Sequence, residues 1–185
     1  PLAHLHISRD GNAVAGIMSA GGYGELTLLR SNGTKASPSH VLTNDQIGTL
    51  DFVGYNSVQG WTGGLAASIE VFATEDYSAS GFKGSKMAFN VSQNGGAGTL
   101  QAMTIDNFGR IGIGVTSPLQ LVDIEGGENS GIDLTTGAIK LRSSVNSIAG
   151  AQFGTVSSHS LDFITSNNSR IRIASSGEVG VGTTS

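Results

Sequence analysis

The chain of 185 residues contains no cysteine, so neither disulfides nor thiolate–metal centres can stabilise it. Aromatic residues make up only 6% and charged residues only 13% of the sequence. Large core anchors and ion pairs are therefore both scarce, unlike in an ordinary globular enzyme. Disorder is not expected either, because disordered chains usually combine high net charge with low hydrophobicity.

Positive charge is also sparse. The net charge is −4, and no short window contains more than two Lys or Arg residues. Because phosphate binding needs a concentrated positive patch, nucleic acid is not an expected partner. No stretch approaches the roughly 20 consecutive apolar residues that cross a bilayer, so membrane insertion is not expected.

Small and turn-forming residues are abundant, with 28 glycines and many serines, threonines and asparagines. Apolar and polar residues alternate with a period of two in several short segments, which is typical of strands. No segment has the apolar spacing of a helix longer than two turns, so we expect an all-β chain of short strands and tight turns. The expected strands are 2–7, 26–28, 50–53, 69–73, 87–91, 100–105, 111–113, 161–164 and 171–173, and turn signals stand at 10–11, 32–33, 94–96, 107–109 and 176–177.

The sequence repeats itself near its middle and its end. Residues 103–117 read MTIDNFGRIGIGVTS and residues 171–185 read IRIASSGEVGVGTTS, while the opening PLAHLHI matches PLQLVDI at 118–124 in its proline, leucine and isoleucine. Such repeats are typical of arrays that stack along an axis. We predict two units, residues 1–117 and 118–185, the second shorter because it lacks an insert. The glycines common to both copies are Gly109, Gly112 and Gly114 in the first and Gly177, Gly180 and Gly182 in the second.

Two of these glycines in each copy lie at alternate positions of an expected strand. Glycine inside a strand costs stability, because it packs nothing and loses backbone entropy. Glycines at alternate positions leave one face of the strand bare, so we predict a close approach of another backbone there, as at the axis of an intertwined trimer. The alternative is a pair of turn or bulge glycines with no axial role.

The segment DNFGRIGIGVTSP at 106–118 resembles the recurrent D-x-x-G-N-V-G-I-G-T-T-S-P signature of phage tail fibres. Arg110 stands where that family usually has asparagine, and Val115 stands where it has threonine. In many of these fibres the repeats precede an intramolecular chaperone of the endosialidase type. The resemblance covers most of the first unit, in the family's order, and part of the second. The other segments that carry it are 26–41, 47–56, 66–76, 86–96 and 161–168.

The resemblance implies an elongated, intertwined homotrimer of parallel chains, a fibre shaft with β knobs, whose strands pair within and between subunits. Its partners would be two further copies of itself and neighbouring fibre segments. It would be an extracellular, structural part of the virion that supports attachment to the host cell. A physical argument agrees, because three chains around one axis share a core and cover one another's strand edges.

No catalytic constellation stands out, so we expect neither enzymatic activity nor a cofactor. The 14 carboxylates are scattered, and Glu75-Asp76 is the sole adjacent pair. Cleavage of a glycosidic bond needs two carboxyl groups about 5 to 10 Å apart, and such a pair could still form across subunits. The sequence contains no Gly-x-Ser-x-Gly segment and no phosphate-binding loop.

Two groups of residues are candidate binding sites. On a strand, His4 and His6 would point to the same side, and in a parallel trimer six imidazoles could hold a transition metal, an arrangement that the resemblance to phage fibre tips supports. The alternative is a solvated strand face. Aromatic side chains in two polar loops could stack on sugars of a host glycan, or they could simply anchor their loops. The candidate carbohydrate-binding residues are Tyr55, Trp61, Tyr77 and Phe82.

Three alternative functions remain at this point. The chain could be a carbohydrate-binding module that recognises a receptor through its aromatic loops. It could be a repeat of a bacterial surface adhesin or fibre. It could also be a polysaccharide-degrading enzyme whose acidic pair forms between subunits.

Overall fold

The structure is a computed structural model that describes residues 22, 24–61, 63–96, 98–127, 129–148 and 150–182. Strands and turns make up this part of the chain, and it contains no helix. No helix that could span a bilayer is therefore found within those ranges. The prediction of an all-β chain is confirmed. His4, His6, the expected strand at 2–7 and the turn at 10–11 lie outside the described residues.

The largest element is a six-stranded sheet with the order β3-β4-β5-β6-β7-β8. Neighbouring strands are antiparallel except for β7 and β8, which are parallel. A short hairpin of β1 (Asn32–Gly33) and β2 (Pro38–Ser39) precedes the sheet. The strands of the sheet are β3 (Gln46–Val53), β4 (Leu65–Ala73), β5 (Ser85–Ser92), β6 (Thr99–Ile105), β7 (Ile111–Ile113) and β8 (Val122–Ile124).

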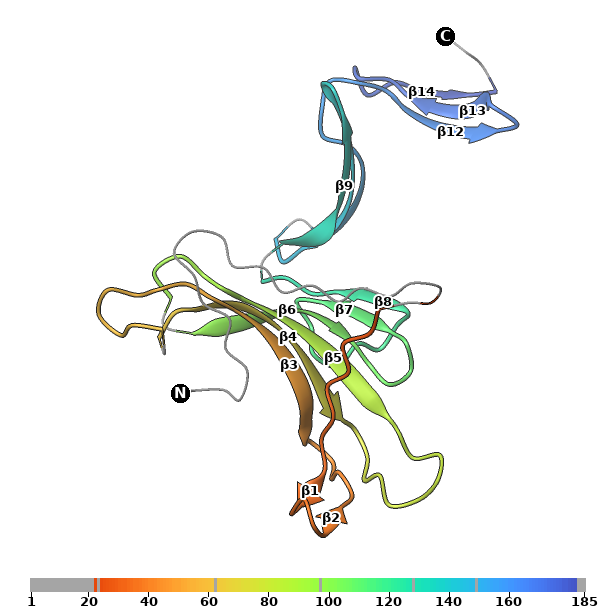
Figure 1. Ribbon diagram of the computed structural model, residues 1–185. Helices are drawn as coiled ribbons and strands as arrows, with labels where there is room; N and C mark the ends of the chain where they lie inside the picture. The colour runs from red at the N-terminus through yellow and green to blue at the C-terminus, as the bar shows by residue number, and fades with distance from the viewer. Residues whose placement is uncertain are drawn as a thin grey trace.

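Two antiparallel, three-stranded sheets follow, with the orders β11-β10-β9 and β12-β13-β14. In Figure 1 the three sheets succeed one another along the molecule, and the curved β9–β11 sheet stands between the other two. The chain therefore forms a series of sheets, not a closed sandwich. The strands are β9 (Asn129–Thr136), β10 (Ile139–Asn146), β11 (Gly150–Thr155), β12 (Leu161–Thr165), β13 (Asn168–Ile173) and β14 (Val179–Val181).

The buried interior of the chain is small. The buried apolar side chains in the described part of the chain are Val41, Ala73, Ala88 and Pro118. One face of the six-stranded sheet buries small or polar side chains, and there the amide of Asn90 donates a hydrogen bond of 3.0 Å to the hydroxyl of Ser68. Large apolar side chains, in contrast, are widely exposed. A single copy of this fold therefore leaves most of its hydrophobic side chains without a partner.

Most of the expected strands are present. Seven of them lie within β3, β4, β5, β6, β7, β12 and β13, in chain order. The expectation for 26–28 is wrong, because these residues pair with no strand in the structure. Seven strands had not been expected: β1, β2, β8, β9, β10, β11 and β14. The division into units 1–117 and 118–185 stays a prediction.

The expected turns at 107–109 and 176–177 each close a hairpin, and the two closing hairpins share one geometry. In the first, Ile105 pairs with Ile111 and Thr104 pairs with Gly112. In the second, Ile173 pairs with Val179 and Arg172 pairs with Gly180, at the positions that the repeat aligns. Each turn contains a left-handed glycine, with φ of 75° at Gly109 and 93° at Gly177. The repeated sequence thus folds twice into the same local structure.

Candidate interaction surfaces

The β9–β11 sheet has one apolar and one polar face. Its register places Ile132, Ser143 and Phe153 side by side across the three strands, while Asp133 and Arg142 pair on the opposite side. Because neighbouring side chains of a strand point to opposite faces, the apolar residues share one face. They are between 45% and 63% exposed: Ile132, Leu134, Ile139, Val145 and Phe153.

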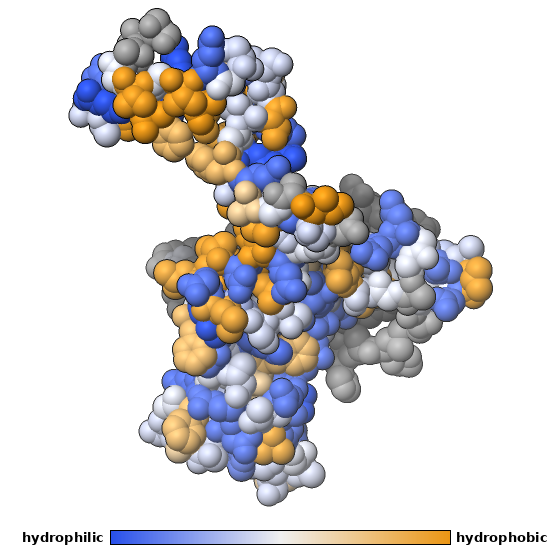
Figure 2. Space-filling view, turned by 180° about the vertical axis from the view of Figure 1, so that it is seen from behind, coloured by the Kyte–Doolittle hydropathy of each residue, from blue (hydrophilic) through white to orange (hydrophobic). Residues whose placement is uncertain are grey.

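The β12–β14 sheet is divided in the same way. Phe163, Ile171 and Val181 pair across its strands on one face, and Asp162 and Arg172 pair on the other. Seen from behind, apolar atoms gather along one side of the end of the molecule that carries this sheet (Figure 2). Phe153 and Phe163 approach each other with ring centroids 6.5 Å apart, so aromatic contact links the apolar sides of the two sheets. We call the two apolar faces together the apolar side of β9–β14.

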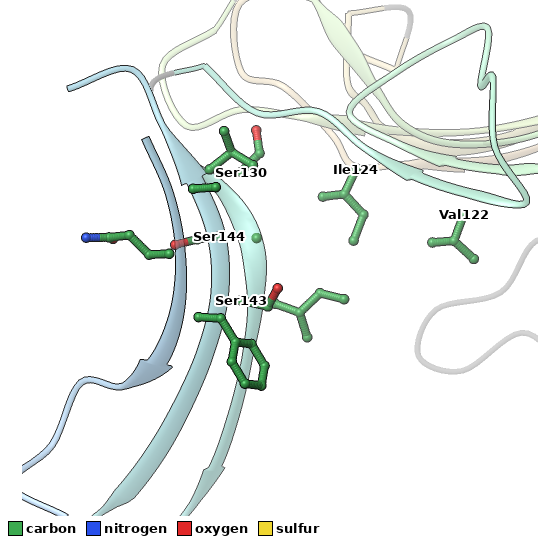
Figure 3. A pocket seen from close by; sticks show the side chains of 11 residues that line it. Val122, Ile124, Ser130, Ser143 and Ser144 are labelled. Carbon is green, nitrogen blue, oxygen red and sulfur yellow. The ribbon is translucent and has the colours of Figure 1, made fainter. Parts of the chain in front are cut away.

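An open hollow of about 460 Å³ separates the β9–β11 sheet from β8. Val122 and Ile124 of β8 point toward this sheet across the hollow (Figure 3). Apolar side chains from both walls line it, including Ile132, Val145 and Phe153. Such a hollow is too open to be a dry core in one copy, and it is wide enough to receive side chains from another.

The polar faces of the same sheets carry ion pairs. Arg142 donates two hydrogen bonds of 2.8 Å to Asp133, and Lys140 lies 3.3 Å from it. These hydrogen bonds hold the pKa of Asp133 well below its usual range, and the contribution of Arg142 is the largest. Arg172 likewise donates bonds of 2.7 and 2.9 Å to Asp162, and the pKa of Asp162 is lowered chiefly by this contact.

The four candidate carbohydrate-binding residues divide between two ends of the six-stranded sheet. Tyr55 and Trp61 lie on the β3–β4 loop, whereas Tyr77 and Phe82 lie on the β4–β5 loop. Successive connections of an antiparallel sheet lie at opposite ends, and Figure 1 shows the two loops apart. The four aromatic side chains therefore cannot form one site within a chain.

Tyr55 and Trp61 form a pair. Their ring centroids are 5.3 Å apart with an interplanar angle of 72°, and the side chains are 66% and 63% exposed. Two backbone hydrogen bonds between Asn56 and Gly60 close the loop, and the Asn56 carboxamide oxygen accepts bonds from the N–H groups of Val58 and Gln59. The aromatic pair thus flanks a turn that is closed by hydrogen bonds.

The other two aromatic residues are placed differently. The Tyr77 hydroxyl lies 3.4 Å from the carbonyl oxygens of Lys83 and Gly84, and its backbone N–H donates to Val41 at 2.9 Å. Burial raises the pKa of Tyr77. These contacts are those of a residue that anchors its loop. Phe82 is 49% exposed on the same loop.

The glycines at alternate positions allow close approaches within the chain. A Cβ at Gly112 would collide with the carbonyl oxygen of Val115, and one at Gly114 would collide with that of Glu125. Gly114 also has a φ of 74°. These contacts explain two glycines without a partner chain, so the assignment of the repeated glycines to a trimer axis stays a prediction.

No group of three or more potential metal ligands is found among the described residues. The metal site expected at His4 and His6 stays a prediction. The apolar side of β9–β14 is the feature that sequence reasoning missed. The alternation of Ile139, Leu141 and Val145 is visible in the sequence and would have indicated β10.

Comparisons with known proteins support the architecture. No family model matches the chain, and no curated protein matches its sequence. The carboxy-terminal domain of the bacteriophage T5 L-shaped tail fibre, solved with its intra-molecular chaperone domain, aligns over 92% of this chain with a TM-score of 0.55 and 13% sequence identity. This chain spans 62% of the length of that structure. A second structure of the same T5 tail-fibre domain aligns over 90% of this chain and 89% of that one, with a TM-score of 0.43 and 12% identity. The alignment with the TM-score of 0.55 shows that the fold of the chain is similar to that of a phage tail-fibre domain.

Proposed function

We propose that this chain is a structural segment of a homotrimeric phage tail fibre that supports attachment to the host cell. Three parallel, intertwined copies would form an elongated shaft with β knobs, joined to neighbouring fibre segments on the outside of the virion. The role is mechanical and needs neither catalysis nor a cofactor. The tail-fibre signature at 106–118 and the similar fold of a T5 tail-fibre domain support this proposal.

The observation that carries the proposal is the bare apolar side of β9–β14. On this side Ile132, Phe153 and Val181 are 50%, 58% and 71% exposed. Exposed apolar patches larger than a few hundred Å² mark interaction sites. Further copies of the chain supply the missing apolar surface, because sheets with one apolar and one polar face can gather around an axis with the apolar faces inward.

Hydrogen bonds and ion pairs occupy several of the carboxyl groups. In the described part of the chain, the carboxyl groups whose pKa departs clearly from its usual value are all shifted downward. They are Asp45, Asp76, Asp106, Asp133 and Asp162.

Solution mass and particle shape test the proposal. Light scattering should give the mass of three chains, and electron microscopy should show an elongated particle. Ile132→Asp places a charge on the apolar side and is expected to dissociate the trimer. Thr135→Asp lies on the polar face of the same strand, beside Lys140, and should leave the mass unchanged. A wild-type chain that is monomeric would contradict the proposal, and so would a trimer that both variants leave intact.

A second candidate function is recognition of a host glycan by the β3–β4 loop. The edge-to-face pair of Tyr55 and Trp61 favours it, because exposed aromatic rings can stack on sugar rings. A polar hollow of about 450 Å³, lined by Asn56, Ser92 and Thr99, lies beside the loop. The geometry of the other loop gives no such support to Tyr77.

Trp61 is the sole tryptophan of the chain, so its fluorescence reports on this loop directly. Titration with host-surface oligosaccharides should change its emission if the loop binds them. Tyr55→Ala should weaken the response, and Phe82→Ala, at the other end of the sheet, should not. An emission that no host glycan alters would count against this candidate.

A further inference from the structure

The two closing hairpins differ in what lies at their outer edges. In the first hairpin, β7 pairs with β6 on one side and with the parallel strand β8 on the other. In the second hairpin, β14 pairs with β13, and no strand of the described chain lies beyond it. The edge that β8 covers in the first copy of the repeat is therefore open in the second.

Hydrogen bonds define which groups face this edge. The Ile111 N–H donates to the carbonyl of Leu121 and the Glu125 N–H donates to that of Ile113, both at 2.9 Å, whereas the Gly114 N–H points inward to Ala102. In the second hairpin the Gly182 N–H makes the same inward bond, to Arg170 at 2.8 Å. Because successive residues of a strand point their N–H groups to opposite sides, the backbone groups of Val179 and Val181 face outward. Unpaired groups of this kind are a template for an added strand.

The glycine after each strand gives an independent indication. Gly114 and Gly182 both have left-handed backbones, with φ of 74° and 68°. At Gly114 the carbonyl of Glu125, which follows β8, occupies the place where a Cβ would lie. At Gly182 nothing lies within 4 Å of that place. The space that the Glu125 carbonyl fills beside Gly114 in the first hairpin is thus empty beside Gly182 in the second.

The side chains of β14 are also exposed, and they are apolar like those that pair with β8 in the first hairpin. Val179 and Val181 are 63% and 71% exposed. In the first hairpin the corresponding residues Ile111 and Ile113 pair with Val122 and Ile124 of β8. Asp123, between these two, accepts a hydrogen bond of 2.9 Å from the Leu119 N–H and so fixes the turn that leads into the strand.

We propose that the outer edge of β14 binds, in parallel, an extended segment with the sequence pattern of residues 118–124. That pattern is Pro-Leu, two residues, then apolar-Asp-apolar. The proposal rests on the proposed function, since the occupant is the beginning of the next unit of the fibre. The joint between successive units would then be a strand of one unit added to the closing hairpin of the unit before it.

The test uses the full chain with a second copy of residues 118–126, PLQLVDIEG, appended after Ser185. This reproduces the covalent spacing of the first joint, where Ser117 precedes Pro118. The control carries the same appended segment with its valine and isoleucine replaced by serine. Amide hydrogen exchange is measured at Val179 and Val181, and Ile111 and Ile113 serve as the internal reference.

We expect exchange at Val179 and Val181 to slow at least about tenfold in the extended chain, as for a newly formed strand, but not in the control. Unchanged exchange at both valines, with Ile111 and Ile113 still protected, would overturn the proposal. Valines already as protected in the unextended chain would also overturn it, because the edge would then have another occupant. The mass of the same sample tests the proposed function separately. A monomeric mass would contradict the trimer, whereas amide exchange at Val179 and Val181 would still show whether the appended segment pairs with β14.

Discussion

At the scale of the residue, glycines and carboxylates determine how several strands end and turns close. Gly114 has a left-handed backbone against which the carbonyl of Glu125 packs, and Gly182 has the same backbone in open space. Asp106 accepts hydrogen bonds from the N–H groups of Phe108 and Arg110, at 2.9 and 2.8 Å. In each case one small or acidic residue determines how a strand ends or a turn closes.

Alanine substitutions at the two glycines should have unequal effects. Gly182→Ala is expected to lower the free energy of unfolding by about 1 to 2 kcal/mol, the cost of a left-handed residue with a Cβ. Gly114→Ala should cost more, about 3 kcal/mol, because its Cβ also meets the carbonyl of Glu125. Urea denaturation of both variants measures the difference. Equal losses would show that the contact with Glu125 is easily relieved.

Acid should weaken the two three-stranded sheets. Hydrogen bonds from Arg142 and Arg172 lower the pKa values of Asp133 and Asp162 in the folded chain. A lowered carboxyl pKa stabilises the fold above the unfolded value of about 3.9, and this contribution is lost as the pH falls toward the folded value. The thermal midpoint should therefore fall between about pH 5 and pH 2.

The arginines allow a matched control for this acid dependence. Arg172→Gln should flatten the dependence of the thermal midpoint on pH, since it removes the partner of Asp162. Arg170→Gln on the same strand should not, because Arg170 donates to the uncharged hydroxyl of Thr165. An equal effect of the two variants would mean that general charge, and not the ion pair, controls the acid response.

At the scale of the element, the two closing hairpins show what the repeat specifies and what it leaves free. The glycines at the turns and the apolar residues of the strands are kept, and so is the register. The capping residues are not: Asp106 and Arg110 form an ion pair in the first turn, whereas Ala174 and Glu178 occupy these positions in the second. In the second turn the Ser176 hydroxyl donates to Glu178 instead.

The double variant Ala174→Asp/Glu178→Arg should give the second hairpin the capping contacts of the first. Because it adds acceptors for turn N–H groups and an ion pair, we expect the thermal midpoint to rise by about 2 to 4 °C. Ala174→Asp alone should gain less, since the new carboxylate faces Glu178. Differential scanning calorimetry distinguishes the three chains. A double variant no more stable than wild type would show that the cap contributes little in this setting.

The sequence predicted strands well where apolar residues alternate without interruption, as at Ile69–Ala73 in β4 and in the repeated hairpins. It failed where polar residues stand on the apolar face. Ser143 interrupts the apolar alternation of β10, and Ser130 interrupts that of β9. Leu26 and Leu28 alternate but pair with no strand, because pairing needs a partner edge that local sequence does not reveal.

The candidate sites were harder to predict than the strands. Four exposed aromatics were expected, and the order of the strands places them in two groups at opposite ends of one sheet. The partnership of Tyr55 and Trp61 depends on the hydrogen bonds that close their loop. The open edge of β14 can be recognised only by comparison with β7, whose occupied edge appears in the structure and not in the sequence.

At the scale of the whole molecule, the chain has much surface and little interior. Its three sheets follow one another (Figure 1). The apolar side of β9–β14 is exposed in the described chain. A fold that exposes this much apolar surface buries little to offset the entropy of ordering the chain. In the proposed trimer, contacts between copies would add apolar burial that one chain lacks.

The thermal midpoint should accordingly depend on protein concentration. If folding and association are coupled, mass action raises the midpoint as the concentration rises. A hundredfold dilution should lower it by several degrees, and Ile132→Asp should remove the dependence together with the trimer. Thr135→Asp should keep it. A midpoint that is constant over this range would indicate that one copy folds by itself.

The parallel pairing of β7 with β8 also has a consequence for how such molecules change over generations. A junction of this kind consists of a short hairpin and the strand that follows it, so its contacts do not depend on the residues between two junctions. The predicted units, residues 1–117 and 118–185, differ greatly in length. Whole segments can then be duplicated or lost without redesign of the contacts. In the proposed fibre, each unit gained or lost would change the length by one step and keep the same kind of junction.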